Sequence, residues 1–242
     1  MSTSTDKTDV LEKLERVDWI AVRDSLNDRG YALIPNVISH RDCDRLIAGY
    51  NDSTLYRKTI SMERYRFGRG EYKYFSYPLP DIIQEAREGL YPKLARVANH
   101  WMEVLKRNHR FPDSFEDLRQ MCWGAGQRKP TPLILKYEEV GYNTLHQDLY
   151  GEVFFPIQSV VFLNQPEAEY EGGEFVMTEQ RPRAQSKAMV IKPNKGDLLI
   201  FTTNFRPVKG SKGYYQVKMK HGVSEITQGN RHTLGIIFHD AL

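Results

Sequence analysis

The chain has 242 residues, of which 40% are hydrophobic and 27% charged, with a formal net charge of +3 at pH 7. It contains no apolar run near the roughly 18–20 residues of a membrane span, and its start lacks the apolar segment of a signal peptide. Cys43 and Cys122 stand far apart, without a CxxC motif, which argues against a disulfide scaffold and a cysteine zinc site. We therefore expect a soluble cytoplasmic protein with no membrane partner.

The N-terminal half of the sequence is mainly helical. Residues 1–9 are polar and predict a disordered tail, and residues 10–125 predict helices that support a core. Expected elements, judged from apolar spacing and capping residues, are helices over 18–29, 39–50, 81–105 and 113–123, and a strand over 31–34. Pro92 should kink or divide the third helix.

The C-terminal half changes to short apolar runs separated by Gly, Pro and Asn. These runs cover residues 133–137, 144–146, 153–163, 174–178, 188–191, 198–203, 222–226 and 233–238. Many short strands at regular spacing predict a β-sandwich or barrel. No linker separates the halves, so we predict one domain over 1–242, with a β core at 130–242 and flanking α-helices.

The most specific local feature is Leu-His-Gln-Asp, which contains His146 and Asp148. On a strand these two side chains would point to the same face. His221, which should open another short strand, is the best candidate for a third ligand. Two imidazoles and one carboxylate leave open positions on a metal, as non-haem Fe(II) requires. The alternative is that His146 caps a turn and Asp148 begins a loop.

Arg231 follows His221 by ten positions. Arg231 and Thr233 should share one strand face, with Leu234 and Ile236 on the other. A guanidinium that points into a barrel is costly unless it meets an anion, and its planar fork suits a carboxylate. The alternative is a structural arginine that is paired with an Asp or Glu.

These motifs together resemble those of the Fe(II)/2-oxoglutarate-dependent dioxygenase superfamily. Further matching segments are GGEFVMTEQ (172–180), KGDLLIF (195–201) and GYALIPNVISHRDCDRLI (30–47). The segments around QDLYGE, FGRGEYKYFSYPLP and the C-terminus are most similar to prokaryotic oxygenases predicted to act oxidatively on damaged nucleic acid, which are AlkB-like by inference. Leu135 and Ile237 replace the Asn and second Arg of AlkB-type demethylases. The His-to-Arg spacing and the GGE turn are closer to the prolyl-hydroxylase branch.

The resemblance implies a double-stranded β-helix, a cupin-like jelly roll, with iron near one mouth. Fe(II) would be held by His146, Asp148 and His221, which are the catalytic and metal residues of the implied site. The co-substrate 2-oxoglutarate would meet Arg231, with Thr233 and Tyr137 adding hydrogen bonds. The enzyme would use O2, hydroxylate a C–H bond and release succinate and CO2. The presence of Asp148 argues against a halogenase.

Residues 56–77 form an unusual basic and aromatic segment. Its candidate substrate residues are Arg64, Arg66, Arg69, Tyr72 and Tyr74. Such a segment suits a flexible lid that grips single-stranded or flipped nucleic acid. The alternative is a structural hairpin with a solvated basic face. A second basic cluster could flank the same mouth and contains Arg206, Lys209, Lys212, Lys218 and Lys220.

Three functions therefore remain open at this point. The first is oxidative dealkylation of a damaged nucleobase, whose hydroxylated product sheds an aldehyde. The second is hydroxylation of a free amino acid, a small metabolite or a peptidyl residue, as in a prolyl hydroxylase, with the basic residues from Arg57 to Lys73 gripping a carboxylate. The third is a non-catalytic cupin-type sensor, which would have no need of the full set of iron and co-substrate residues.

Overall fold

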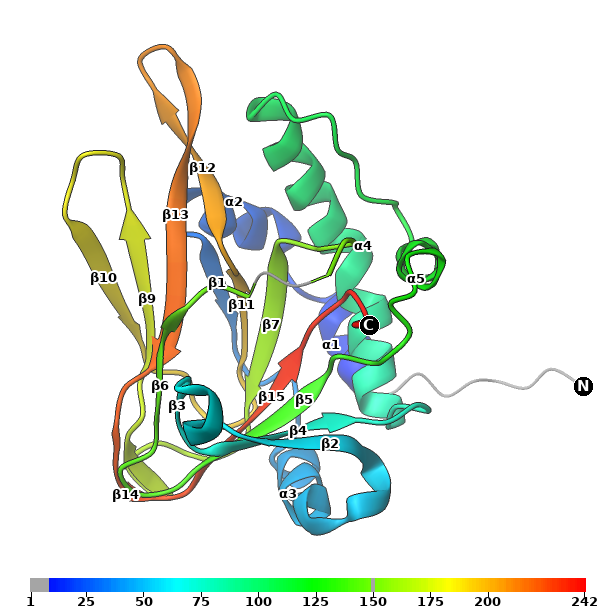
Figure 1. The fold of residues 1–242 in the computed structure, drawn as a ribbon, viewed down its shortest axis with the longest axis vertical. Coiled ribbons are helices and arrows are strands. Elements are labelled where there is room, and N and C mark those ends of the chain that lie inside the picture. The colour runs from blue at the N-terminus through cyan, green and yellow to red at the C-terminus, as the bar shows by residue number, and fades with distance from the viewer. Residues whose placement is uncertain (1–8, 149–150) are drawn as a thin grey trace, which may run out of the picture.

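Two β-sheets face each other, and helices cover the outer side of one of them (Figure 1). The structure is a computed structural model that describes residues 9–148 and 151–242. The larger sheet has the strand order β1-β11-β7-β15-β5-β4-β2, and the smaller sheet has the order β10-β9-β13-β6-β3, with β12 paired to β13. This is the predicted jelly-roll core with flanking helices.

The strands of the seven-stranded sheet come from both halves of the chain. They are β1 (Tyr31–Ile34), β2 (Tyr56–Ser61), β4 (Glu71–Phe75), β5 (Leu133–Tyr137), β7 (Ile157–Phe162), β11 (Leu198–Thr202) and β15 (Arg231–Ile236). The β core is therefore not confined to residues 130–242, as the sequence analysis expected. Antiparallel pairing of β4 with β5 and of β1 with β11 adds N-terminal strands to the sheet.

The opposing sheet is built mainly from the C-terminal half. It contains β3 (Gly68–Arg69), β6 (Tyr142–His146), β9 (Phe175–Gln180), β10 (Ser186–Ile191), β12 (Phe205–Gly210) and β13 (Gly213–Val223). A separate pair consists of β8 (Tyr170–Gly172) and β14 (Ile226–Gly229). The β12–β13 hairpin was not predicted, and His221 lies within the long strand β13 rather than opening a short one.

The helices begin and end largely where the capping residues indicated. They are α1 (Asp9–Glu15), α2 (Trp19–Arg29), α3 (His40–Ala48), α4 (Asp81–Val104) and α5 (Phe115–Gly124). The Asp18 carboxylate accepts hydrogen bonds from the backbone of Ile20 and Ala21 at 3.0 Å, and Gly30 ends α2 with φ 80°. Of the described helices, none combines the length and apolar character that crossing a membrane requires.

Two helix predictions were wrong. The predicted tail included Asp9, which begins α1, whereas residues 1–8 lie outside the described residues. Pro92 does not divide its helix, because α4 runs unbroken from Asp81 to Val104. Eleven residues of α4 are buried. The stability gained by packing them on the sheet exceeds the cost of the backbone hydrogen bond that Pro92 cannot donate.

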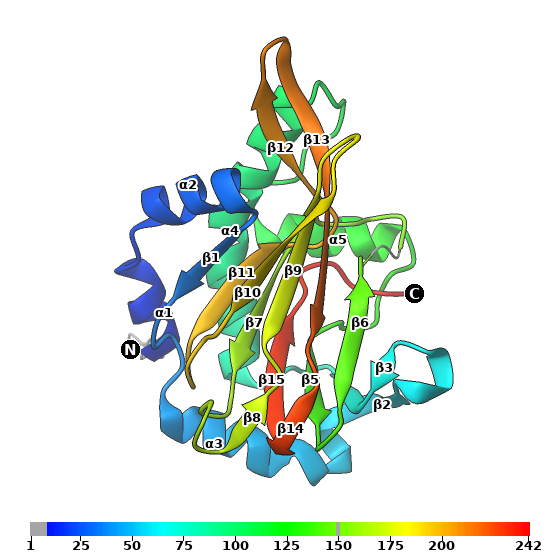
Figure 2. The same ribbon diagram turned by 90° about the vertical axis from the view of Figure 1, so that its left-hand side faces the viewer.

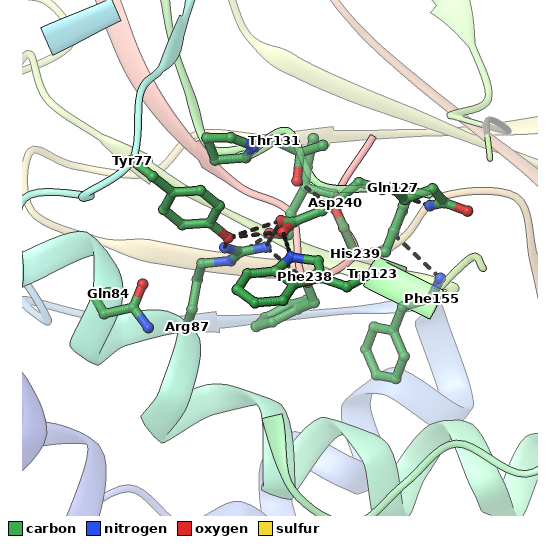
Figure 3. Close-up of polar contacts among 12 residues, drawn as sticks. Tyr77, Gln84, Arg87, Trp123, Gln127, Thr131, Phe155, Phe238, His239 and Asp240 are labelled. Atoms are coloured by element: carbon green, nitrogen blue, oxygen red, sulfur yellow. Dashed lines mark hydrogen bonds and ion pairs between the residues drawn. The ribbon is translucent and has the colours of Figure 1, made fainter. Parts of the chain in front are cut away.

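A buried polar network joins α4 to the chain that follows β15 (Figure 3). Arg87 pairs with Asp240 at 2.9 Å, and the two side chains are 0% and 1% exposed. Arg87 also donates to the carbonyl groups of Ile237 and Phe238 at 2.9 and 2.8 Å. The Tyr77 hydroxyl donates to the Asp240 carboxylate at 2.8 Å. The network fixes the end of the chain against α4.

Replacing Asp240 with alanine should lower the free energy of unfolding by about 3–5 kcal/mol, because the Arg87 charge would remain buried without its partner. Urea denaturation would measure this loss. Asp24→Ala is the matched control, since the Arg23–Asp24 pair is 52% and 58% exposed and such pairs contribute about 0–1 kcal/mol. Equal effects of the two substitutions would contradict the prediction.

Candidate active site

A cavity of about 440 Å³ lies between the two sheets. The larger sheet contributes to its wall through β4, β5, β7 and β15, and the smaller sheet through β6, β9 and β13. Along β15, Arg231 and Thr233 line the cavity, whereas Leu234 and Ile236 pack in the core on the helical side. The alternation predicted for this strand is therefore present.

His146, Asp148 and His221 come together at the cavity wall. His146 and His221 are paired across β6 and β13. Nε2 of each imidazole lies 3.5 Å from a different oxygen of the Asp148 carboxylate. One candidate ligand atom from each residue lies within 4.8 Å of the other two, so the three can hold one metal ion. Asp148 is just beyond the end of β6, so the shared strand face assumed for it was wrong.

Each imidazole turns its Nε2 atom toward this site. Nδ1 of His146 lies 2.7 Å from the Thr144 carbonyl oxygen and must be the donor, which fixes the orientation of the ring. Burial, together with the smaller effect of the neighbouring His146, lowers the pKa of His221 to about 3. His221 is therefore neutral at pH 7, as a metal ligand must be.

Two glutamine side chains position the segment that carries His146 and Asp148. Gln147 donates to the carbonyl oxygens of Asn204 and Met219 at 2.8 and 2.9 Å, which fastens this segment to β13 near His221. Gln158 donates to Oδ2 of Asp148 at 2.6 Å. Neither role was predicted. The sequence held one signal for such a role, the amide side chain of Gln158 in the mostly apolar strand Ile157–Phe162.

Arg231 is the deepest charged group of the cavity. Its side chain is buried, and none of its three guanidinium nitrogen atoms makes a hydrogen bond of normal distance and angle with the described residues. The hydroxyl of Tyr170 is a polar neighbour, because Arg231 lowers the pKa of Tyr170 against the larger, opposite effect of burial. The guanidinium carbon lies 5.5 and 5.2 Å from the ring centres of Tyr137 and Phe162. A structural ion pair, the alternative for Arg231, is therefore absent from the described part of the chain. The site fits a ligand carboxylate.

The GGE turn makes room for this arginine. A Cβ atom on Gly173 would lie 3.0 Å from Cδ of Arg231 and 2.1 Å from Cδ1 of Ile226, and Gly173 has φ +62°. Thr233 and Tyr137 also line the cavity near Arg231. Burial raises the pKa of Tyr137 to about 12, although Arg231 opposes this shift, so its hydroxyl is protonated at pH 7.

Residues 56–77 form a hairpin rather than a free lid. β2 and β4 pair antiparallel, and β4 pairs with β5 within the larger sheet. Tyr72 and Tyr74 line the cavity with their rings edge to face, 5.5 Å between centres. This segment therefore has the form of the structural hairpin that was the alternative to a lid.

The basic residues of the hairpin lie outside the cavity lining. Arg64, Arg66 and Arg69 are exposed. Arg57 donates to the Pro130 carbonyl at 2.9 Å, and Lys73 donates to the Tyr50 carbonyl at 3.1 Å. The second basic cluster is also divided, because Arg206 is buried and paired with Glu179.

Two other histidines take structural positions. Nδ1 of His232 lies 3.1 Å from the Asn164 side-chain oxygen, on the face of β15 away from the cavity. His239 accepts a hydrogen bond from the Phe155 backbone at 3.3 Å and does not line the cavity. Asn143 does line it, as its place near His146 indicated.

The fold and the histidine–aspartate–histidine cluster are those of the Fe(II)/2-oxoglutarate oxygenases. The chain is similar to a prolyl hydroxylase from Trichoplax adhaerens, solved with a hypoxia inducible factor peptide fragment (TM-score 0.58, 16% identity, 98% of this chain and 94% of that chain). It is also similar to a Pseudomonas putida prolyl-4-hydroxylase (TM-score 0.55, 13% identity, 93% of this chain and 100% of that chain). A third similar structure is a 2OG-Fe(II) oxygenase family protein from Burkholderia pseudomallei (TM-score 0.53, 13% identity, 93% of this chain and 94% of that chain).

Sequence comparison gives the family. Residues 70–241 match Oxygenase-NA, described as "Oxygenase, catalysing oxidative methylation of damaged DNA". Two Mycobacterium tuberculosis proteins, "Uncharacterized protein Rv2227" and "Uncharacterized protein MT2286", are 43% identical over 227 residues, which cover 94% of this chain and 92% of each of them. The chain belongs to the Oxygenase-NA family. The predicted superfamily, fold class and oxygenase activity are confirmed, and this class of enzyme uses Fe(II), 2-oxoglutarate and O2.

Proposed function

We propose that His146, Asp148 and His221 hold Fe(II) and that Arg231 binds the C5 carboxylate of 2-oxoglutarate. The observation that carries this proposal is the buried guanidinium of Arg231, which makes no hydrogen bond of normal distance and angle with the described residues and lies in the same cavity as the three candidate ligands. A buried charge of this kind requires an anion. Thr233 and Tyr137 supply hydroxyl groups along the same wall.

The described residues fit both groups. The ligand set is two imidazoles and one carboxylate, the facial arrangement that suits non-haem Fe(II). When bound, iron with 2-oxoglutarate and O2 supplies the oxidation that hydroxylates a C–H bond and releases succinate and CO2. The protein holds the ligands in place through Thr144, Gln147 and Gln158. The facing sheets exclude water from the Arg231 end.

We further propose that the substrate is a damaged nucleobase carrying an alkyl group. Asp148 and Arg231 are the only Asp, Glu, Lys or Arg side chains that line the cavity among the described residues, and the iron and the co-substrate would occupy both. A free amino acid would then bury its ammonium and carboxylate groups without partners. The remaining wall is mainly aromatic and aliphatic, with residues such as Phe67, Tyr72 and Leu133, and its other polar side chains are uncharged, including Asn143 and Ser159. Such a wall suits a planar neutral ring. The description of the family as acting on damaged DNA supports the same substrate class.

A peptidyl residue is the second candidate, because it is neutral and the similar folds include prolyl hydroxylases. The proposal of a free amino acid as substrate loses support, since none of the basic residues from Arg57 to Lys73 lines the cavity. Arg57 and Lys73 themselves bond to backbone carbonyls. A non-catalytic sensor would have no use for the co-substrate arginine beside a complete ligand set.

Substrate-stimulated succinate formation tests these alternatives. The Fe(II)-loaded enzyme should convert 2-oxoglutarate faster with single-stranded oligonucleotides that carry N-methylated bases without a charge at pH 7, and formaldehyde should form in equal amount. Free amino acids should have no effect. Stimulation by proline-containing peptides, without any by methylated oligonucleotides or nucleosides, would reject the nucleobase proposal and leave the iron and co-substrate roles intact.

A further inference from the structure

Two aromatic rings stand parallel on the surface beside the cavity. Tyr65 and Phe67 lie in the turn between β2 and β4, with ring centres 5.6 Å apart and planes at 19°. They are 46% and 47% exposed, although aromatic rings of this size are usually buried. Phe67 also lines the cavity, so the stacked pair extends from its opening onto the surface. The pair contributes little to a core.

This turn is fixed relative to the candidate iron site (Figure 2, beside β6). The Phe67 carbonyl oxygen accepts hydrogen bonds from both the backbone N–H and the hydroxyl of Thr144 at 2.8 Å. The Thr144 carbonyl in turn accepts from His146. A Cβ atom on Gly68 would lie 2.2 Å from the Tyr142 carbonyl oxygen. Gly68 therefore permits close packing on β6, rather than the flexibility that we expected of a lid.

Three exposed arginines surround the stacked pair. Arg64 has its guanidinium carbon 5.8 Å from the Tyr65 ring centre. Arg66 and Arg69 line a shallow depression, which also contains Glu63 and Glu225. No ion pair within 4.0 Å is found for any of the three with the described residues, whereas Arg45 and Arg110 pair with nearby carboxylates. Among the described residues none of the three is held in a close ion pair, although the charge of Arg69 contributes to the lowered pKa values of Glu63 and Glu138. Their guanidinium groups are therefore open to a phosphate.

We propose that the Tyr65–Phe67 pair binds the base next to the one in the cavity, and that Arg64, Arg66 and Arg69 bind the adjoining phosphates of a single strand. This proposal rests on the proposed function. A base stacked on Tyr65 would continue the existing stack, and stacking needs no particular base sequence. The arginines would neutralise the backbone on either side. The partner is thus a single-stranded oligonucleotide, bound at one damaged base and at least one neighbour.

The test compares three forms of one substrate, using the methylated base that best stimulates the wild-type enzyme. These are the free nucleoside, a trinucleotide with that base in the centre, and the same trinucleotide with abasic flanking positions. For the wild-type enzyme, KM should be about tenfold lower for the full trinucleotide than for the abasic form, the effect of one base–aromatic stack. Tyr65→Ser should remove this difference and leave nucleoside turnover unchanged. Tyr214→Ser, which changes an equally exposed tyrosine on β13, is the matched control.

A second measurement tests the arginines. Replacing Arg64, Arg66 and Arg69 with glutamine should reduce the slope of log Kd against log salt by about 0.7 per lost phosphate contact, measured with a fluorescent single-stranded oligonucleotide.

The outcomes distinguish the two proposals. If Tyr65→Ser leaves the preference for flanking bases unchanged, or if the wild-type enzyme has no such preference, the surface proposal is wrong and the nucleobase function stands. If the glutamine variant keeps the wild-type slope of log Kd against log salt, the three arginines do not bind the phosphates. If no methylated nucleoside or oligonucleotide is turned over, while peptides are, both proposals fail.

Discussion

Replacing His146 with alanine is expected to lower iron-dependent succinate formation by more than about 100-fold, since even outer partners of metal ligands contribute 10–100-fold. The imidazole lies 3.5 Å from the Asp148 carboxylate and turns its Nε2 atom toward the site. The same substitution should weaken Mn(II) binding, which titration measures without any turnover. The two readouts together test the ligand role directly.

The fold should survive this change, because the His146 side chain is 32% exposed at the end of β6. Thermal unfolding of the variant would verify this. His100→Ala, on an exposed position of α4, is the matched control and should leave both activity and metal binding unchanged. Wild-type turnover in the His146 variant would reject the proposed metal site.

The second large effect is expected at Arg231, where one substitution should weaken co-substrate binding but stabilise the ligand-free protein. Arg231→Met should raise KM for 2-oxoglutarate by about 100-fold or more, because hydrogen bonds to charged groups contribute about 1.5–3 kcal/mol each. In the absence of metal and co-substrate, the same variant should be more stable than wild type by about 1 kcal/mol. The reason is that Arg231 buries three nitrogen atoms that make no hydrogen bond of normal distance and angle with the described residues, at a cost only partly offset by the Tyr137 and Phe162 rings.

Turnover at varied 2-oxoglutarate concentration would measure KM, and thermal unfolding with and without 2-oxoglutarate and Mn(II) would measure the change in stability and in ligand binding. Wild type should gain stability from the ligands, and Arg231→Met should start higher and gain little. Arg206→Met is the contrasting variant, because Arg206 is also buried but pairs with Glu179, so its loss should destabilise the protein. Destabilisation by both substitutions, with an unchanged KM, would show that Arg231 is a structural residue.

The reactive centre was largely predictable from the sequence. His146, Asp148, His221 and Arg231 are residue types with few roles in an apolar strand context, so their presence indicates chemistry even before the fold is known. The alternation along β15 also placed Arg231 and Thr233 on one face, because side chains on a strand alternate strictly. Asp148 shows the limit of this rule, since it reaches the site from beyond the end of β6.

The positioning residues could not be predicted in the same way. Gln147 donates to the carbonyls of Asn204 and Met219, which are 57 and 72 positions away in the sequence. Nothing in the local pattern indicates such a bond, because it depends on how β6 and β13 meet. The β12–β13 hairpin was missed for a related reason. Its lysines resemble a solvated loop, and pairing with β9 stabilises the strand only in the folded sheet.

The sequence by itself predicted the class of this protein, an oxygenase, and the four residues that we propose hold its iron and its co-substrate. The tertiary structure alone decided which parts of residues 56–77 face the cavity. Tyr72 and Tyr74 line it, whereas Arg64, Arg66 and Arg69 stay outside on the surface. The physical reason is that β4 takes its side-chain directions from pairing with β5, while the turn takes its directions from positive φ at Arg66 and from packing on β6. Residue type indicates what a side chain can do, and only long-range pairing determines where it points.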